Sequence, residues 1–393
     1  MGRFRRARTL FHGFTTLIVV NFVLNLHNAM VAFVHSPLLG QFYSTEVISL
    51  LYIVQSSFLI LTLLLVPTII GFIGPRSLLI TLIPVVQFAV LFFGIAKDPV
   101  SATFFFMLHA VALWTIFYLL DLYVEGMTKD EGKTGGIRAS FLTAANLAIF
   151  LGPLAVVFLV AGTYYAPLYA ASALVVVPAF ALALTAFSKL PTRAPKKNAF
   201  REAFQTLSCC RPGVVYAIAS QFLLRMFYCW AAIYIPLYLI YTVGLSWQVV
   251  GTLITFAMFA FVLLEIPLGI LADRYFGEKE IMTIGFIILG IATALLSFVP
   301  VTPIVWWGLV FFITRIGAAM VEITSESHFF KRVNETDSGL VSLFRIMNPL
   351  AFIVGPALGI LFLFFAPLQY LFAFCGVILL FGATLSMRII DTK

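Results

Sequence analysis

Charged residues are scarce in this sequence, and that scarcity excludes a water-soluble protein. Asp, Glu, Lys and Arg make up 10% of its 393 residues, whereas a soluble domain carries roughly 25%. Hydrophobic residues make up 62%, and the mean hydropathy is +1.08. Because so few charges cannot cover a surface exposed to water, we predict an integral membrane protein with many spans.

Cysteine is also sparse, and the sequence lacks the motifs of several protein classes. The four cysteines predict no disulfide framework, because Cys209 and Cys210 lie in a basic connection while Cys229 and Cys375 lie in apolar runs. There is no HExxH motif, no P-loop, no paired histidine ligands and no sizeable polar domain. We therefore expect no enzymatic activity, no metal or cofactor, and no transport driven by ATP.

Long apolar runs fill almost the whole chain. A membrane-spanning helix needs about 20 apolar residues, and runs of this length predict twelve spans. The first run follows a cluster of arginines, but it is too long for a signal peptide and lacks a small-residue cleavage site. The predicted spans are residues 11–35, 46–70, 76–96, 100–122, 138–160, 164–188, 213–242, 247–271, 280–299, 303–325, 338–364 and 367–389.

The positive charges predict how the chain is oriented. If the N-terminus is inside, the inner connections receive nearly all the lysines and arginines, and the outer ones receive only Lys97. The positive-inside rule then predicts cytoplasmic termini in a plasma (inner) membrane. The formal net charge is +8, but these charges are scattered over short connections, which argues against nucleic acid as a partner.

A polar segment divides the chain into two nearly equal parts. It covers residues 191–198, between the sixth and seventh spans. We predict an N-terminal six-helix bundle over 1–188, a cytoplasmic basic linker over 189–212 and a C-terminal six-helix bundle over 213–393. Phe200, Phe204 and Leu207 recur at helical spacing within the linker, which is typical of a short amphipathic helix on the inner leaflet. An ordinary solvated linker is the alternative.

Similar features recur in the two halves at almost one offset. The second and eighth spans carry a proline near their ends, the fourth and tenth end in two acids four residues apart, and the fifth and eleventh contain Gly-Pro. These pairs are Pro67 and Pro267, Asp121–Glu125 and Glu322–Glu326, and Gly152-Pro153 and Gly355-Pro356. A duplicated six-span unit is typical of a transporter whose halves rock about a central site.

The connection between the eighth and ninth spans reads GILADRYFGEK over residues 269–279. It resembles the G-x-L-A-D-R-x-G-R-K loop of the major facilitator superfamily, and the twelve spans, the basic linker and the repeat agree with that family over the whole chain. Two departures stand out: one extra residue separates Arg274 from Gly277, and Glu278-Lys279 replaces the usual basic pair. The first-half counterpart, residues 71–76, is shorter and lacks the Asp.

The resemblance implies an all-α fold of two pseudo-symmetric six-helix bundles and a gate at this loop. In the family the loop locks the cytoplasmic ends of the halves together, with its Asp at a helix N-terminus of the other half. We therefore expect Asp273 to meet the start of the fifth span near Arg138, and Arg274 to pair with an acid of the tenth span. The alternative is that these charges only end helices at the interface. The predicted gating residues are Gly269, Asp273, Arg274, Gly277, Arg138, Glu322 and Glu326.

Polar side chains inside the spans are candidates for the substrate site. In the family the first, fourth, seventh and tenth spans line the central cavity, which would bring Asn25, His109, Arg225 and Arg315 together. The predicted cavity residues are Asn25, His27, Asn28, Gln55, His109, Trp114, Gln221, Arg225, Arg315 and Asn348. For each amide the alternative is a role in joining helices, and a lone histidine is more often a packed residue than a proton carrier.

Arg225 and Arg315 are harder to explain structurally than the amides, because a charge well inside a span needs a partner or water. Glu322 follows Arg315 by seven residues on the same helix face, so it is a candidate intrahelical partner for that arginine. If Arg225 and Arg315 both face the cavity instead, they favour an anionic metabolite as the substrate.

The sequence thus predicts a monomeric transporter, secondary active or facilitative, that moves a small solute across the lipid bilayer by alternating access. A coupling proton or ion stays open as a partner. Glu265 is a candidate proton site, although its closeness to the loop favours a gating or structural role. A drug/proton efflux antiporter and a lysophospholipid or lipid carrier are the alternatives. Gly152-Pro153 matches only part of the antiporter signature, and a lipid carrier would need a lateral opening.

Overall fold

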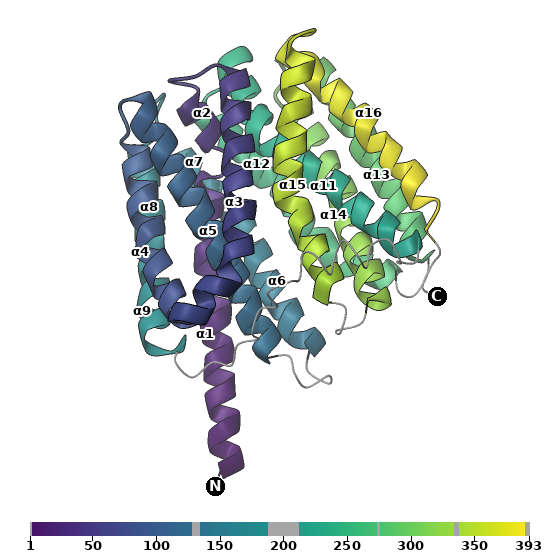
Figure 1. Ribbon diagram of the computed structural model, residues 1–393. Helices are drawn as coiled ribbons and strands as arrows, with labels where there is room; N and C mark the ends of the chain where they lie inside the picture. Colours follow the sequence, from purple (N-terminus) through teal and green to yellow (C-terminus); the bar gives the residue numbers. More distant parts are fainter. Residues whose placement is uncertain (1, 128–133, 188–211, 273–275, 334–337, 390–393) are drawn as a thin grey trace. The chain divides into compact units, whose positions relative to one another are not determined.

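The computed structural model describes residues 2–127, 134–187, 212–272, 276–333 and 338–389. These residues are almost entirely helical, and they include 12 segments long and apolar enough to cross a membrane, which confirms the predicted fold class and number of spans (Figure 1). The helices are α1 (Gly2–Val31), α2 (His35–Leu39), α3 (Thr45–Ile73), α4 (Pro75–Gly94), α5 (Pro99–Met127), α6 (Thr134–Leu151), α7 (Leu154–Leu159), α8 (Ala166–Val175), α9 (Val177–Thr185), α11 (Pro212–Leu237) with the π-helical turn η3 (Tyr238–Thr242), α12 (Trp247–Leu271), α13 (Glu278–Leu295) with the 3₁₀ turn η5 (Leu296–Phe298), α14 (Val305–Arg332), α15 (Ser338–Leu363) and α16 (Leu368–Ser386).

The helices form two compact units. The N-terminal unit comprises Met1–Tyr43 and Phe58–Lys197, and the C-terminal unit comprises Ser44–Ser57 and Asn198–Lys393. Helix α3 therefore contributes its first half to the C-terminal unit and its second half to the N-terminal unit. The predicted amphipathic helix at residues 200–207 lies outside the described residues, and the predicted bundle boundaries stay a prediction.

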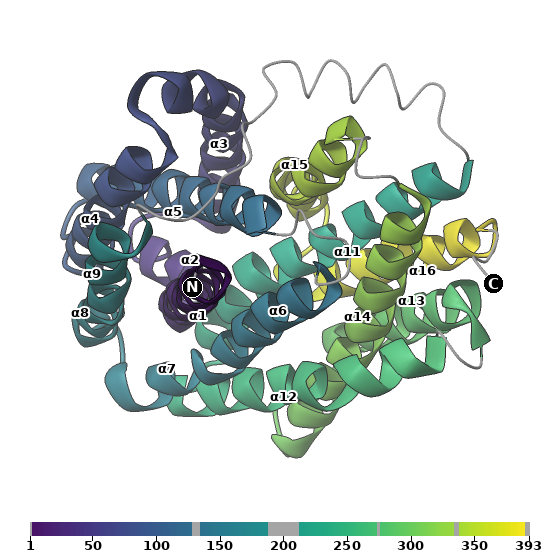
Figure 2. The same ribbon diagram turned by 90° about the horizontal axis from the view of Figure 1, so that it is seen from below.

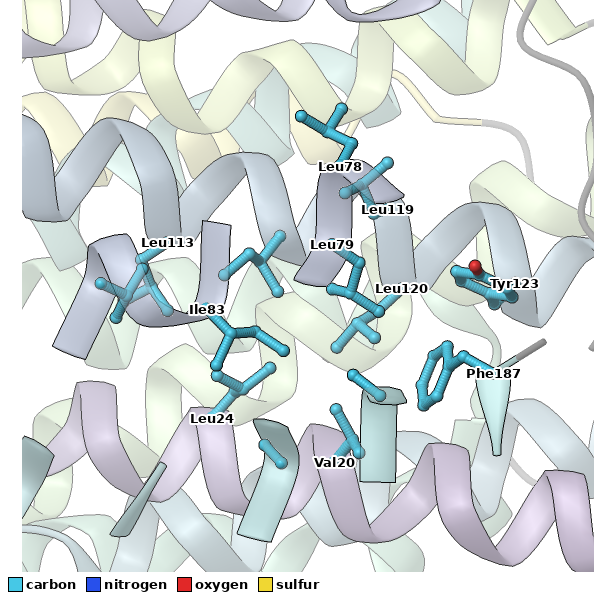
Figure 3. Close-up of a cluster of buried hydrophobic side chains, with 14 of the residues drawn as sticks. Val20, Leu24, Leu78, Leu79, Ile83, Leu113, Leu119, Leu120, Tyr123 and Phe187 are labelled. Carbon is cyan, nitrogen blue, oxygen red and sulfur yellow. The ribbon is translucent and has the colours of Figure 1, made fainter. Parts of the chain in front are cut away.

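Aliphatic side chains from α1, α4 and α5 fill the core of the N-terminal unit, as Figure 3 shows. Val20 and Leu24 of α1 meet Leu79 and Ile83 of α4, and Leu120 of α5 joins them; all five are fully buried. Because lipid tails are as apolar as leucine, the hydrophobic effect does not drive helices together in a bilayer. The core therefore holds these helices together chiefly by close van der Waals packing.

The two Gly-Pro pairs have different structures. At Gly152-Pro153 helix α6 ends, and α7 begins at Leu154. A Cβ atom at Gly152 would lie 2.3 Å from the Cβ of Ala29 in α1, so only glycine allows this close approach. Pro356, in contrast, lies inside the continuous helix α15. The repeat in sequence therefore does not give a symmetric break in structure.

Glycines hold α13 close to both of its neighbours in the C-terminal unit, α14 and α16 (Figure 2). Gly285 of α13 and Gly317 of α14 face each other, since a Cβ atom on Gly317 would lie 2.8 Å from the Gly285 carbonyl oxygen. On the other side, a Cβ atom on Gly376 of α16 would lie 2.5 Å from the carbonyl oxygen of Gly290. Such small-residue contacts are the usual means by which membrane helices approach closely.

The loops that correspond in the two halves share one backbone conformation. Gly74 precedes α4 with φ 77° and ψ 155°, and Gly277 precedes α13 with φ 96° and ψ 165°. This region is open almost only to glycine. The shortened first-half loop therefore keeps the same turn into the next helix, although it lacks the Asp of the second-half loop.

Replacing Gly74 with alanine should destabilise the protein by about 1–3 kcal/mol, because the side chain makes this conformation strained. A Cβ atom at Gly74 would meet no other atom within 4 Å, so strain alone sets the cost. Gly71→Ala is the matched control, since Gly71 is helical and its Cβ atom would also meet nothing within 4 Å. Thermal unfolding in detergent measures both variants; equal melting temperatures would contradict the expectation.

Candidate functional site

An ion-pair network links α11 and α14 within the C-terminal unit. The Nη2 atom of Arg225 on α11 lies 3.2 Å from Oε1 of Glu322 and 3.7 Å from Oε1 of Glu326. The spacing of four residues puts both carboxylates on one face of α14. Glu322 and Glu326, the acidic pair that the sequence showed as a repeated feature, therefore both lie close to Arg225 of the neighbouring helix.

Further side chains of α11 extend this network. The hydroxyl of Tyr228 donates to Oε2 of Glu322 at 2.7 Å. With the Gln221 amide oriented to satisfy its neighbours, its oxygen accepts from Nε and Nη2 of Arg225 at 2.9 and 2.8 Å, and its nitrogen donates to Oγ of Ser325 at 3.1 Å. Gln221, Arg225 and Tyr228 share one helix face, because they are spaced four and three residues apart.

Arg315 has no comparable partner. It is 4% exposed, and its guanidinium carbon lies 4.9 Å from the centre of the Phe227 ring. Its Nη1 atom donates to Oγ1 of Thr314 at 3.3 Å, and its Nε atom has no hydrogen-bond partner among the described residues. Arg225 and Arg315 thus differ in kind: Arg225 is paired with carboxylates, and Arg315 is a buried cation whose Nε donor is unused by the described residues.

The hypothesis that Glu322 neutralises Arg315 within α14 is wrong, because Glu322 contacts Arg225 and Tyr228 of α11 instead. Seven residues correspond to about 10 Å along a helix axis. An ion pair between Arg315 and Glu322 would need both side chains extended toward each other along the helix.

Three histidines form a buried cluster in the N-terminal unit. Nε2 of His27 lies 2.9 Å from Nε2 of His109, and Nδ1 of His27 lies 3.0 Å from the carbonyl oxygen of Ser172. His35 in α2 places its ring 5.3 Å from that of His109 and hydrogen-bonds the Tyr169 hydroxyl at 2.8 Å. The sequence singled out His27 and His109 separately, and it missed His35. No three His, Cys, Asp or Glu residues in the described part of the chain could hold a metal ion.

The other predicted cavity residues are separate from these two groups. Asn25 donates to the side-chain and backbone oxygens of Asn21 one turn earlier, both at 2.9 Å, so its amide is used within α1. Gln55 is buried, and its Nε2 atom has no hydrogen-bond partner in the part of the chain that the structure describes. The remaining three are half-buried: Asn28 on α1, Trp114 on α5 and Asn348 on α15.

Three of the seven predicted gating residues have side chains outside the described residues. These are Asp273, Arg274 and Arg138, and the side chain of Glu265 also lies there, so their contacts stay predictions. Gly269 is in the last turns of α12, where an added Cβ atom would make only an ordinary contact, 3.9 Å from Ile323.

Glu278, the acid that departs from the family motif next to the predicted gate, forms an ion pair in the structure. Glu278, which stands where the family has a basic residue, is 1% exposed at the start of α13. Its Oε1 atom accepts a hydrogen bond from Nζ of Lys331, near the end of α14, at 2.6 Å. A negative charge is also favourable at a helix N-terminus. The departure from the motif is therefore an acid that pairs with a lysine of the next span.

The twelve apolar spans of the described residues define a multi-pass integral membrane protein. The Major Facilitator Superfamily model matches residues 17–339 and 218–392. The chain therefore belongs to the major facilitator superfamily, and the protein is a multi-pass membrane transporter. No curated protein sequence matches it.

Solved structures share the fold. The POT family transporter PepTSo superimposes with a TM-score of 0.71, 12% identity, and coverage of 95% of this chain and 97% of that chain. A variant of the nucleoside transporter NupG gives 0.73 and 12%, with 96% and 100% covered. A bacterial homolog of the human lysosomal transporter Spinster, inward-facing and unoccupied, gives 0.68 and 12%, with 96% and 93% covered. Identities this low show a common fold and carry no information about the substrate.

Proposed function

We propose that this transporter moves a small solute by alternating access, as a secondary active or facilitative carrier, and that its substrate carries an anionic group that binds Arg315. The family supports transport, and the duplicated six-span sequence supports halves that rock against each other. Placement in the plasma membrane with cytoplasmic termini rests on the distribution of lysine and arginine. The observation that carries the anionic substrate is the buried guanidinium without a carboxylate partner.

The donors of Arg315 fit an oxyanion. A guanidinium has five N–H donors and no acceptor, and the described residues satisfy one of them, through Thr314 Oγ1. Phe227 lies against the guanidinium, a contact that favours a fixed plane and leaves the donor edge for a ligand. A carboxylate or phosphate matches that edge with two parallel hydrogen bonds. Binding such a group also offsets the cost of a buried, unpaired cation.

Arg225 is the poorer candidate for the anion. It already lies near the carboxylates of Glu322 and Glu326, so an anionic ligand there would meet two negative charges. Like charges at such distances repel. Arg225 therefore supports the site by holding α11 against α14, and Arg315 provides the binding charge.

The structure-based comparisons leave the cargo open, because one relative is named a nucleoside transporter and the others are named only by family or compartment. A cationic drug would be repelled by Arg315, which disfavours the drug/proton antiporter. A lysophospholipid carries a phosphate that could bind Arg315, so a lipid carrier is the second candidate.

The test is a thermal-shift screen of the purified protein against carboxylates, phosphate esters, lysophospholipids and cationic drugs. We expect a set of small anions to stabilise the protein, and Arg315→Gln to weaken that binding about 10- to 100-fold, as a lost charged hydrogen bond does. Arg315→Lys, which keeps the charge without the planar fork, should fall between.

Arg388→Gln is the matched control, because Arg388 is an exposed arginine of the same unit, and it should leave the anion response unchanged. An equal response in wild type and Arg315→Gln would overturn the proposal. A response to lysophospholipid alone would favour the lipid carrier, and a response to cationic drugs alone would reject an anionic substrate.

A further inference from the structure

The hydrogen bonds of His27 fix which of its ring nitrogens carries the proton. The Ser172 carbonyl oxygen, 3.0 Å from Nδ1, can only accept. The Ser172 hydroxyl donates to the His27 carbonyl oxygen at 3.1 Å, so its oxygen is an acceptor for Nδ1, 2.7 Å away. Both contacts require an N–H at Nδ1. A neutral His27 therefore has a bare Nε2 atom.

The state of His27 in turn fixes that of His109. Nε2 of His27 and Nε2 of His109 are 2.9 Å apart, so the one that is bare must accept from the other. His109 therefore carries its proton on Nε2, and its Nδ1 atom is bare. That atom is buried and has no hydrogen-bond partner in the described residues. The hydrogen-bonded series from Ser172 through His27 to His109 thus ends on one unused lone pair, at Nδ1 of His109.

We propose that Nδ1 of His109 is a proton-binding site, and that the proton bound there biases the conformation of the transporter. A proton from water that binds at this atom breaks none of the hydrogen bonds of the cluster. A proton on Nε2 of His27 would instead set two N–H groups against each other across 2.9 Å. Among the ring nitrogens of His27 and His109, Nδ1 of His109 is therefore the one that can gain a proton without loss of a contact.

The groups that face His109 are few and neutral. They are His27 of α1, His35 of α2 and, behind His35, the Tyr169 hydroxyl of α8. Helix α4, which packs along α5, presents Phe93 to the ring of His35, and its arginine, Arg76, bonds the Leu184 carbonyl oxygen far along the helix. No carboxylate of the described residues pairs with the cluster. A second proton on His35 would be repelled, because its ring centre is only 5.3 Å from that of His109.

The direction of the bias follows from burial. His27 and His109 are 0% and 1% exposed, and His35 is 7% exposed. A buried imidazolium without a counter-charge is costly, so the described conformation favours the neutral ring. A conformation that hydrates the cluster binds the proton more tightly, so lowering the pH shifts the population toward it. His35, as the most exposed of the three rings, marks the side from which water would enter.

Histidine-selective ¹⁵N NMR of the whole protein tests the site itself. The chain has five histidines, and the nitrogen shift separates bare from protonated ring atoms. We expect one bare Nδ1 signal that disappears in His109→Gln and that loses its bare position only as the pH falls below about 6.5, where an unburied histidine gains its proton. A signal that stays bare over the range in which wild type remains folded would overturn the proposal, and that measurement needs no variant.

Hydrogen–deuterium exchange of α1 and α5 tests the bias. After correction for intrinsic rates, exchange in wild type should accelerate on acidification, by at most about tenfold per pH unit for one proton. His109→Gln should abolish this dependence, because glutamine can still donate to Nε2 of His27 but cannot take up a proton. His12→Gln, a substitution fifteen residues before His27 in the sequence, should keep it. Acid-independent exchange in wild type, or unchanged acid dependence in His109→Gln, would reject the bias.

Discussion

Replacing Gly317 with leucine should strongly destabilise the C-terminal unit. A Cβ atom at this position would lie 2.6 Å from the amide nitrogen of Leu289 and 2.8 Å from the carbonyl oxygen of Gly285. Both are backbone atoms of α13, so no side chain can rotate away, and α13 must separate from α14. Overpacking of a core typically costs about 1–3 kcal/mol, and we expect the upper end or more here. The yield of monodisperse protein and its thermal unfolding in detergent measure the effect.

Alanine at two glycines of α14 provides the matched comparison. Gly317→Ala adds only the Cβ atom, and even that atom clashes with α13. Gly308→Ala adds the same atom in the same helix, but its nearest neighbour there is a leucine side-chain carbon 3.6 Å away. Gly308→Ala should therefore melt close to wild type, and Gly317→Ala well below it. If the two variants have the same melting temperature, the close contact between α13 and α14 does not require glycine at position 317.

The twelve spans could be predicted from the sequence because length and hydropathy alone define them. An apolar run of some 20 residues has one favourable place in a bilayer, and that constraint is strong. The positions at which spans break were harder to predict. Gly152-Pro153 and Gly355-Pro356 look alike in sequence, yet only the first ends a helix. The two glycines also have different neighbours, Ala29 of α1 at Gly152 and Cys229 of α11 at Gly355, and no local pattern encodes these tertiary contacts.

The candidate site could be predicted as a set of residues, but not as a set of contacts. Helical spacing showed that Glu322 and Glu326 share a face of α14. It could not show that this face meets Arg225 of α11, so the alternative of an intrahelical partner for Arg315 is wrong. The same limit applies to the histidines. His35 lies in the short helix α2, beyond the first span, and its place beside His109 follows from tertiary packing.

Arg225→Gln should lower the melting temperature of the protein in the absence of any substrate. It would remove the cation that lies 3.2 Å from Glu322 and 3.7 Å from Glu326, two carboxylates one helical turn apart. Breaking a fully buried ion pair costs about 3–5 kcal/mol. The three side chains keep exposed fractions of 24%, 27% and 29%, so we expect a smaller loss, about 2 kcal/mol. Arg225→Gln/Glu322→Gln/Glu326→Gln, which removes all three charges, should recover much of it.

Arg315→Gln should have the opposite effect on the same measurement. Arg315 has no carboxylate partner among the described residues, so replacing it removes the cost of a buried, unpaired cation. The substrate-free variant should therefore melt at or above the wild-type temperature, while it loses the response to anions. The two substitutions separate an arginine that holds helices together from one that binds a ligand. A marked loss of stability in substrate-free Arg315→Gln would make both arginines structural and would remove the basis for an anionic substrate.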